Sequence, residues 1–93
     1  MELFERDDEK AAINETKHGV TFTEAETVFD DGLSSIFPDR YHSGDEERFV
    51  IVGESNRRRL LTVVYTLREP RIRLISAREA TPRERHDYEE SED

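Results

Sequence analysis

Apolar and polar residues alternate with a period of two through much of the second half of the chain, which is the pattern of β-strands. Four such runs are present, at residues 33–37, 48–54, 60–67 and 71–77. The segments between the last three runs are short and contain turn-forming residues, so we expect hairpins and an antiparallel sheet. The run at 60–67 is apolar on both faces, which predicts a central strand. Leu3-Phe4 could add a short strand at one edge.

The spacing of apolar residues is helical before the predicted sheet. A first helix, capped by Asp7 or Asp8, is expected to end at Gly19, where glycine favours termination. A second helix is predicted after Thr21, which has the spacing of a capping box with Glu24. Val20 could pack against Ala25 as a hydrophobic staple, and the apolar positions of the helix are expected in the core: Phe22, Ala25, Val28 and Phe29.

A last helix is predicted from Pro82 to about Glu90. Thr81 and Glu84 have the spacing of a capping box around a proline at the first helical position, which is a strong start signal. The sequence therefore predicts an α+β fold, with two N-terminal helices, a four-stranded antiparallel sheet and a C-terminal helix.

In the run at 71–77, strict alternation would separate apolar from basic side chains. One face is expected to hold Ile72, Leu74 and Ser76, and the other Arg71, Arg73, Ile75 and Ala77. A sheet face that presents guanidinium groups suits anions. An ordinary strand with a solvated arginine face would show the same pattern.

The composition is that of a small domain that a partner chain could help to stabilise. Of 93 residues, 33% are hydrophobic and 40% are charged, a balance typical of disorder where apolar residues are scattered. Because they fall in periodic runs here, we expect one folded domain, 1–93, with a frayed end at 89–93. The absence of cysteine excludes disulfides and thiolate metal sites.

The net charge of −9 is unevenly distributed. Residues 1–47 contain 14 Asp and Glu against 4 Lys and Arg, and residues 86–93 add 5 acids. Residues 48–85 contain 10 Arg against 4 Glu, so the middle of the chain is basic. The N-terminus has no basic region followed by an apolar one, and no apolar run approaches membrane-spanning length. We therefore expect a soluble, cytoplasmic protein with no membrane contact.

The candidate chemistry rests on arginine, lysine, histidine and glutamate. The sequence has no glycine-rich phosphate loop and no His-Glu-x-x-His motif, and its three histidines lack metal-ligand spacing, so we expect no cofactor. The remaining side chains are those that cleave RNA without a metal. Glu46 and Arg48 would share a face, with Arg73 and Arg78 on the neighbouring or next strand. Surface Glu and Arg pairs also commonly serve stability alone.

Six motifs, in this order and spacing over residues 4–88, carry a resemblance to a known family. They are Lys17-His18-Gly19-Val20, Phe22-x-x-Ala25-x-x-Val28-Phe29-Asp30-Asp31, Glu46-Glu47-Arg48-Phe49-Val50, Leu60-x-x-Val63-Val64-Tyr65-Thr66, Arg71-Ile72-Arg73-x-Ile75-Ser76-Ala77-Arg78 and Glu84-Arg85-x-x-Tyr88. Each motif is weak alone, and together they are specific. The chain resembles the BrnT family of bacterial toxins.

The resemblance implies a RelE-like fold and a ribonuclease that halts translation. It also implies a co-encoded partner, a BrnA antitoxin that binds DNA through a ribbon-helix-helix domain. The toxin-antitoxin complex would repress its own operon, so the toxin would reach operator DNA only through the antitoxin.

Site residues follow from the same resemblance. His18 or Glu46 would carry protons. Arg48, Arg73 and Arg78 would bind the reacting phosphate. Three further residues would contact RNA: Lys17, Arg59 and Ser76.

One position departs from the family pattern. Similar proteins usually have an aromatic residue, often tryptophan, where this chain has Arg6, and the difference bears on the packing of the first helix. Two other functions remain open. A non-catalytic module could bind the antitoxin and act only in autoregulation of the operon. A metal-dependent enzyme is disfavoured by the ligand spacing and would lose activity with chelators.

Overall fold

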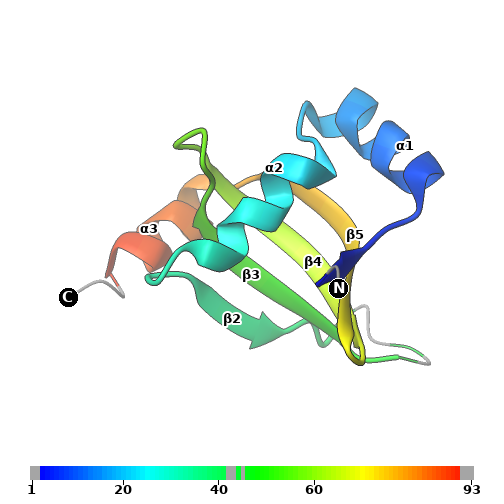
Figure 1. The fold of residues 1–93 in the computed structure, drawn as a ribbon. Helices are drawn as coiled ribbons and strands as arrows, with labels where there is room; N and C mark the ends of the chain where they lie inside the picture. Colours follow the sequence, from blue (N-terminus) through cyan, green and yellow to red (C-terminus); the bar gives the residue numbers. More distant parts are fainter. Residues whose placement is uncertain (1–2, 42–43, 45, 91–93) are drawn as a thin grey trace.

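One five-stranded sheet organises the molecule, with helices on both of its faces (Figure 1). The computed structural model describes residues 3–41, 44 and 46–90. In chain order the elements are β1 (Phe4–Glu5), α1 (Asp8–His18), α2 (Phe22–Glu26), the 3-10 helix η1 (Thr27–Asp30), β2 (Ser35–Pro38), β3 (Arg48–Glu54), β4 (Leu60–Arg68), β5 (Arg71–Glu79) and α3 (Pro82–Glu90).

The strand order is β1-β5-β4-β3-β2, and this confirms the α+β fold, the antiparallel hairpins and the central position of β4. The opening residues do form an edge strand: β1 runs parallel to β5, with Phe4 opposite Ile72, so the sheet is mixed and has five strands rather than four. β2 lies two residues later than predicted at its start. Of the predicted frayed end, Glu89 and Glu90 are helical and 91–93 lie outside the described residues.

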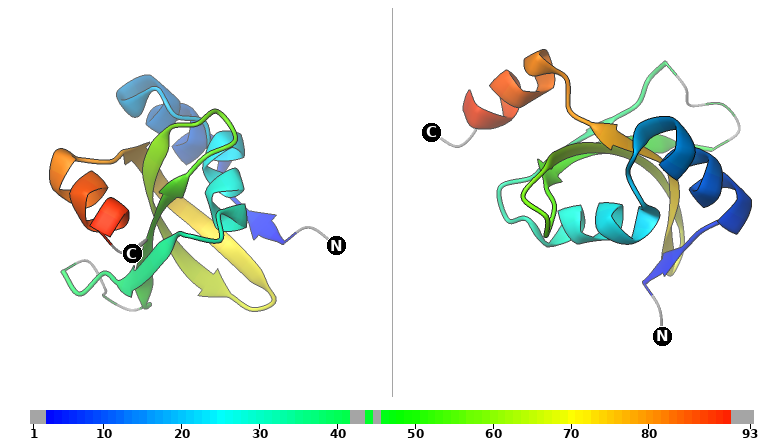
Figure 2. Two further views of the ribbon diagram at one scale, coloured as in Figure 1. Left: turned by 90° about the vertical axis from the view of Figure 1, so that its left-hand side faces the viewer. Right: turned by 90° about the horizontal axis from the view of Figure 1, so that it is seen from above.

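The sheet curves around α2, and α3 lies on its opposite side (Figure 2). The core between the sheet and the N-terminal helices consists of Val20, Phe22, Ala25, Val28, Ile51, Leu61, Val63, Tyr65, Leu74 and Ala77. Phe29 packs against it, so the predicted core of the second helix is confirmed. A smaller cluster on the other side joins Val50, Val52 and Leu60 to Val64, Ala80 and Tyr88. We call this second side of the sheet the α3 face.

Aromatic rings cross the first core in a line from β1 to β3. Phe4 meets Phe29 edge to face with ring centroids 5.2 Å apart, and Phe29 meets Tyr65 in the same way at 5.0 Å. Tyr65 stacks on Phe49 at 5.6 Å. Burial raises the pKa of Tyr65, since the phenolate would be poorly solvated there.

The strict alternation predicted for β5 is wrong, because a β-bulge interrupts it. Ser76 pairs with Val64, but the next residue of β4, Tyr65, pairs with Leu74, so Ile75 is an extra residue. The bulge returns Ala77 to the core side with Leu74, and it places Ser76 on the α3 face.

Side-chain caps fix the helix ends, as the sequence predicts. Asp7 Oδ1 accepts hydrogen bonds from the Glu9 and Lys10 amides at 2.9 and 3.3 Å, and Gly19 ends α1 with φ 68°. The box that begins α3 is complete: Thr81 Oγ1 accepts from the Glu84 amide at 3.1 Å, and Glu84 Oε1 accepts from the Thr81 amide at 2.8 Å.

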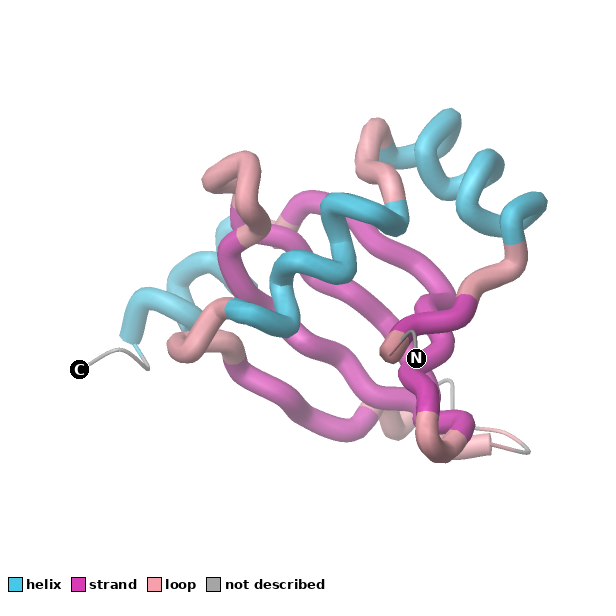
Figure 3. The backbone as a smooth tube through the Cα atoms, viewed as in Figure 1, coloured by secondary structure: helices cyan, strands magenta, loops and turns pink. Residues whose placement is uncertain are grey.

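The last helix leaves the end of β5 and lies behind the sheet (Figure 3). Asp31 ties it down, since one oxygen of this carboxylate accepts from the Tyr88 hydroxyl at 2.7 Å and from the Glu54 amide at 2.8 Å. Burial opposes ionisation of Asp31, but these bonds and one from the Leu33 amide leave its pKa lowered. No helix within the described residues is long and apolar enough to cross a membrane.

Candidate functional site

Beyond α3, the α3 face carries polar side chains across three strands, and the middle one, Thr66, is buried with its hydroxyl donating to the Glu47 carbonyl. The register pairs Arg48 of β3 with Thr66 of β4, and Thr66 with Arg73 of β5. Directly paired residues project to the same face, so these three side chains lie in one row. We call Arg48, Thr66 and Arg73 the arginine row. It lies toward the β4–β5 hairpin, at the opposite end of the sheet from α3 (Figure 1).

Acidic residues surround the arginine row and make an ion-pair network. Arg73 Nη1 lies 3.5 Å from Glu5 Oε1, and Arg68 Nε lies 3.9 Å from the same oxygen. Arg68 Nη2 is also 3.6 Å from Glu46 Oε2. The predicted residues Glu46 and Arg73 are thus linked through the ion pairs of Arg68 and Glu5. Because these side chains remain partly exposed, the pairs contribute little stability, and a phosphate could replace a carboxylate at small cost.

Arg78 lies on the same face but at the other end, beside α3. It pairs with Thr62 in the register, and its guanidinium donates two hydrogen bonds to Glu84, at 2.8 and 2.9 Å. Glu84 also accepts from Thr62 Oγ1 at 2.8 Å. The Arg78 hydrogen bonds lower the pKa of Glu84 to about 2, against the opposing effect of burial. This glutamate therefore both caps α3 and neutralises Arg78.

The predicted residues of α1 lie at the β5 edge of the sheet. Lys17 and His18 occupy the last turn of α1, where the helix dipole favours basic side chains. Together with Ile75 and Ser76 of β5 they line a hollow of about 180 Å3. Ser76 belongs both to this hollow and to the α3 face, so it connects α1 with the strand that bears Arg73.

A buried asparagine fixes α1 against β5. Asn14 is 5% exposed, and its side chain pairs with the backbone of Ala77 as a further strand would. Its Nδ2 donates to the Ala77 carbonyl at 2.8 Å, and its Oδ1 accepts from the Ala77 amide at 3.0 Å. The same Nδ2 donates to the Val20 carbonyl at 2.9 Å. Since His18 follows one helical turn later, Asn14 sets the position of His18 beside β5.

Arg59 is not brought together with the other predicted residues. It lies on the α2 side of the sheet, where its Nε donates to Glu24 Oε2 at 3.0 Å and its Nη2 binds Glu24 Oε1 and the Gly19 carbonyl. Glu24 is 4% exposed and also accepts from the Ser55 hydroxyl at 2.6 Å. Hydrogen bonds from Arg59 lower the pKa of Glu24 despite its burial. Because the Glu24 carboxylate binds Arg59 and Ser55, the capping box predicted at the start of α2 is only half formed. Thr21 Oγ1 accepts a hydrogen bond from the Glu24 amide.

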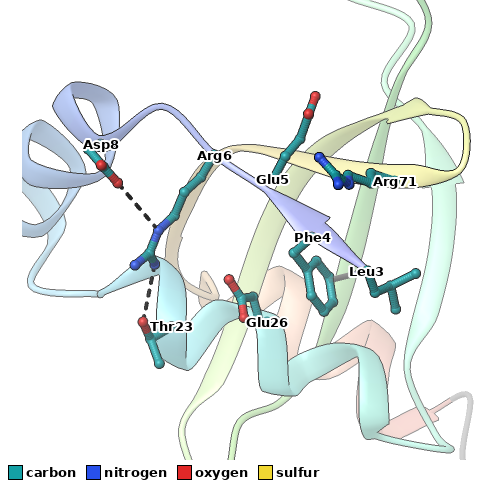
Figure 4. Close-up of a pocket in the computed structure, with 8 residues that line it drawn as sticks. All are labelled: Leu3, Phe4, Glu5, Arg6, Asp8, Thr23, Glu26 and Arg71. Atoms are coloured by element: carbon teal, nitrogen blue, oxygen red, sulfur yellow. Dashed lines mark hydrogen bonds and ion pairs between the residues drawn. The ribbon is translucent and has the colours of Figure 1, made fainter. Parts of the chain in front are cut away.

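A larger hollow of about 560 Å3 lies between β1, α2 and the start of β5 (Figure 4). Arg6 crosses it, with Nη1 donating to Thr23 Oγ1 at 3.1 Å and Nε 3.8 Å from Asp8 Oδ1. At the position that departs from the family pattern, polar contacts therefore join the start of α1 to α2. Three acidic residues, Glu5, Asp8 and Glu26, are among those that line the hollow, which makes it less suited to an anion.

Several residues that shape the site were not predicted. Asn14 could have been found as a polar residue on the inward stripe of α1, three positions after Ala11. Arg68 shares the face of Thr66 by the period of two, but its link to Glu5 depends on the parallel pairing of β1. The bulge at Ile75 has no local signal in the sequence.

The pKa of Glu84 predicts a measurable acid sensitivity. Because its folded-state pKa is below the ordinary 4.5, the ion pair stabilises the protein fully above about pH 4.5 and is lost as pH falls toward about 2. We expect Glu84→Gln to lower the free energy of unfolding by roughly 1 to 2 kcal/mol at pH 6, after allowance for solvent screening. The loss should disappear near pH 2. Denaturant unfolding between pH 2 and 6 tests this.

Glu89→Gln is the matched control, because it removes the same charge from α3 without disturbing Arg78. Its effect on the free energy of unfolding should be small. A deficit of Glu84→Gln that stays constant down to pH 2 would contradict the assignment of the stabilisation to the ion pair.

Comparisons with known proteins identify a family and a similar fold. A family model described as "Ribonuclease toxin, BrnT, of type II toxin-antitoxin system" matches residues 7–84. None of the curated proteins searched matches the chain. The crystal structure of the ribonuclease toxin BrnT of Brucella abortus is similar in fold, with a TM-score of 0.64 and 24% sequence identity. That likeness covers 82% of this chain and 92% of the Brucella chain. The match along most of its length places this chain in the BrnT family of ribonuclease toxins of type II toxin-antitoxin systems.

Proposed function

We propose that this chain is an endoribonuclease that cleaves RNA without a metal ion, inhibits translation and is neutralised by a BrnA-like antitoxin. The observation that carries the proposal is the arginine row on one sheet face, with Glu46 linked to Arg73 through Arg68 and Glu5. The family supplies RNA as substrate and an antitoxin as partner. Action in the cytoplasm, and contact with operator DNA only through the antitoxin complex, complete the proposal.

The proposed reaction uses the ribose 2′-hydroxyl of the RNA as its nucleophile. A base takes the hydroxyl proton, the 2′-oxygen attacks the adjacent phosphorus, and the bond to the 5′-oxygen breaks as an acid protonates that oxygen. His18 or Glu46 would carry these protons.

The arginines would stabilise the negative charge that builds on the phosphate in the transition state. Arg48 and Arg73 would act from the arginine row, and Arg78 would act after exchanging Glu84 for phosphate. Ser76 and Lys17 would hold the neighbouring RNA. The proposed scheme uses side chains alone. Within the described residues, no group of three or more His, Asp and Glu is placed to hold a metal ion.

A second function is favoured by the internal pairing of the cations. Arg73 and Arg78 already face Glu5 and Glu84, as they would in a stable protein-binding surface. A non-catalytic module that binds the antitoxin and acts only in autoregulation would keep these pairs.

The test that separates the two functions is RNA cleavage by the free chain. We expect the purified chain to cleave single-stranded RNA in the presence of EDTA, and its expression without the antitoxin to arrest growth. Co-expression of the antitoxin should restore growth. Intact RNA and normal growth, with antitoxin binding retained, would contradict the endoribonuclease. Cleavage that is abolished by EDTA and restored by a divalent metal would contradict metal independence alone.

A further inference from the structure

We propose that the hollow between α1 and β5 receives one unstacked base of the RNA, with Ile13 and Ile75 as its apolar walls. The hollow is lined by Lys10, Ile13, Asn14, Lys17, His18, Ile75 and Ser76. This inference rests on the proposed function, since it assigns part of the substrate to a defined place. It adds Ile13 and Ile75 as residues that determine which sequences are bound.

The β-bulge is the reason that Ile75 can serve as a wall. In a regular strand, Ile75 would alternate with Leu74 and Ser76 and would have its own partner on β4. The register instead passes from Ser76 to Leu74, which leaves Ile75 without a partner in the β4–β5 ladder. Bulges redirect one side chain and are frequent beside functional sites. Here the redirected side chain lines the hollow at the edge facing α1.

Exposure of Ile13 is the second observation. Ile13 lies on α1 and is 57% exposed, although an isoleucine at this position gains nothing from contact with water. It lines both this hollow and a second, mostly apolar one along α1. Two isoleucines from different elements, Ile13 of α1 and Ile75 of β5, thus line the same hollow.

The charges around the hollow favour an anionic polymer. Its lining includes two lysines and a histidine and no carboxylate. The larger hollow in Figure 4 is the opposite case, with three carboxylates against two arginines. A hollow lined by two isoleucines and by basic side chains suits a base with its attached phosphate, because the base has apolar faces and a polar edge.

Position along β5 connects the hollow with the arginines. Ser76 lines the hollow and precedes Arg78 by two residues on the same face, while Arg73 lies on that face toward the hairpin. A phosphate bound to either arginine would leave an attached base within reach of the hollow. Asn14 fixes the distance between the walls, because it holds α1 to Ala77.

The experiment measures binding rather than cleavage. The probes are a short single-stranded RNA analogue with 2′-fluorine in place of every 2′-hydroxyl, which prevents cleavage, and the same oligonucleotide with one base removed in turn. The abasic probes keep every phosphate, so they change base contacts alone. In the wild type, we expect removal of one particular base to weaken binding roughly three- to tenfold, the scale of one partly buried apolar contact. In Ile13→Ala and Ile75→Ala, the same removal should have little further effect.

Ile36→Ala is the matched control. Ile36 has the same side chain and the same 57% exposure as Ile13, but it lies on β2 at the other edge of the sheet. This variant should bind every probe as the wild type does. Ile75→Val is included so that a folded variant is available if Ile75→Ala unfolds, and thermal melting identifies that case.

Three results would overturn the proposal. The first is equal affinity of the wild type for all abasic probes. The second is retention of the wild-type preference in both isoleucine variants. The third is loss of antitoxin binding in these variants with unchanged RNA binding, which would make the hollow a protein contact. Because the probes cannot be cleaved, these results are independent of whether the chain is an endoribonuclease.

Discussion

Asn14→Ala is expected to lower the free energy of unfolding by about 2 to 4 kcal/mol and the melting temperature by roughly 10 to 25 °C. The substitution removes three hydrogen bonds and leaves the amide and carbonyl of Ala77 and the carbonyl of Val20 without partners in the interior. Unpaired buried polar groups cost more than the net gain of the bonds that satisfied them. Thermal and denaturant unfolding measure the loss.

Thr16→Ala is the control for this change, because Thr16 lies on the exposed side of the same helix. Its effect should stay within about 0.5 kcal/mol. Asn14→Asp keeps an acceptor for the Ala77 amide but turns an oxygen toward two carbonyl oxygens, so it should not rescue stability. A free energy of unfolding for Asn14→Ala within about 0.5 kcal/mol of the wild-type value would show that the asparagine does not hold α1 in place.

Arg73→Ala is expected to reduce RNA cleavage by about two orders of magnitude, if the chain acts as proposed. Removing a guanidinium takes away charge and directed donors that act on the transition state more than on bound RNA, so the cleavage rate should fall more than the affinity. Single-turnover cleavage with the protein in excess measures the rate. Arg73→Lys should recover only part of it, since an ammonium lacks the planar pair of donors.

Arg83→Ala is the matched control, because Arg83 is an arginine on α3 that is 86% exposed and paired with Asp87. It should cleave RNA at the wild-type rate. Arg73 is paired with Glu5 at a partly exposed site, so its removal should change stability by no more than about 1 kcal/mol. A folded Arg73→Ala protein with the full cleavage rate would exclude the arginine row from the chemistry.

Local signals in the sequence were sufficient for most of the secondary structure. The caps at Asp7 and Thr81, and the glycine after α1, act within a few residues, so their side chains reach their partners in nearly any context. The strands β3 and β4 were predicted because their runs of apolar residues match the strand residues that are buried in the structure.

The bulge at Ile75 could not be predicted in this way. Whether a bulge forms depends on how β5 packs against β4 and α1. Leu74 and Ala77 are three residues apart, so both can face the core only if the register shifts between them. The same holds for β1, since two residues cannot specify a strand without the edge of β5 to receive them.

The candidate site was predicted only in part, because many of its contacts join residues that are far apart in the sequence. Arg48 and Arg73 follow from strand parity once the neighbours are known, whereas partner choice among charges is settled in three dimensions. Arg59 illustrates this, because its buried partner Glu24 lies 35 positions earlier in the chain. Nothing near Arg59 in sequence distinguishes it from the arginines of the α3 face.

The line of aromatic rings gives the protein a built-in optical reporter. The chain contains no tryptophan and three tyrosines, so its intrinsic fluorescence is that of tyrosine. Tyr65 lies in the core among phenylalanines, Tyr88 anchors α3 to Asp31, and Tyr41 is 95% exposed. In a Tyr88→Phe protein, the signal that changes on unfolding comes from Tyr65 alone. Comparing it with the wild type would show whether α3 detaches before the sheet unfolds, without any attached dye.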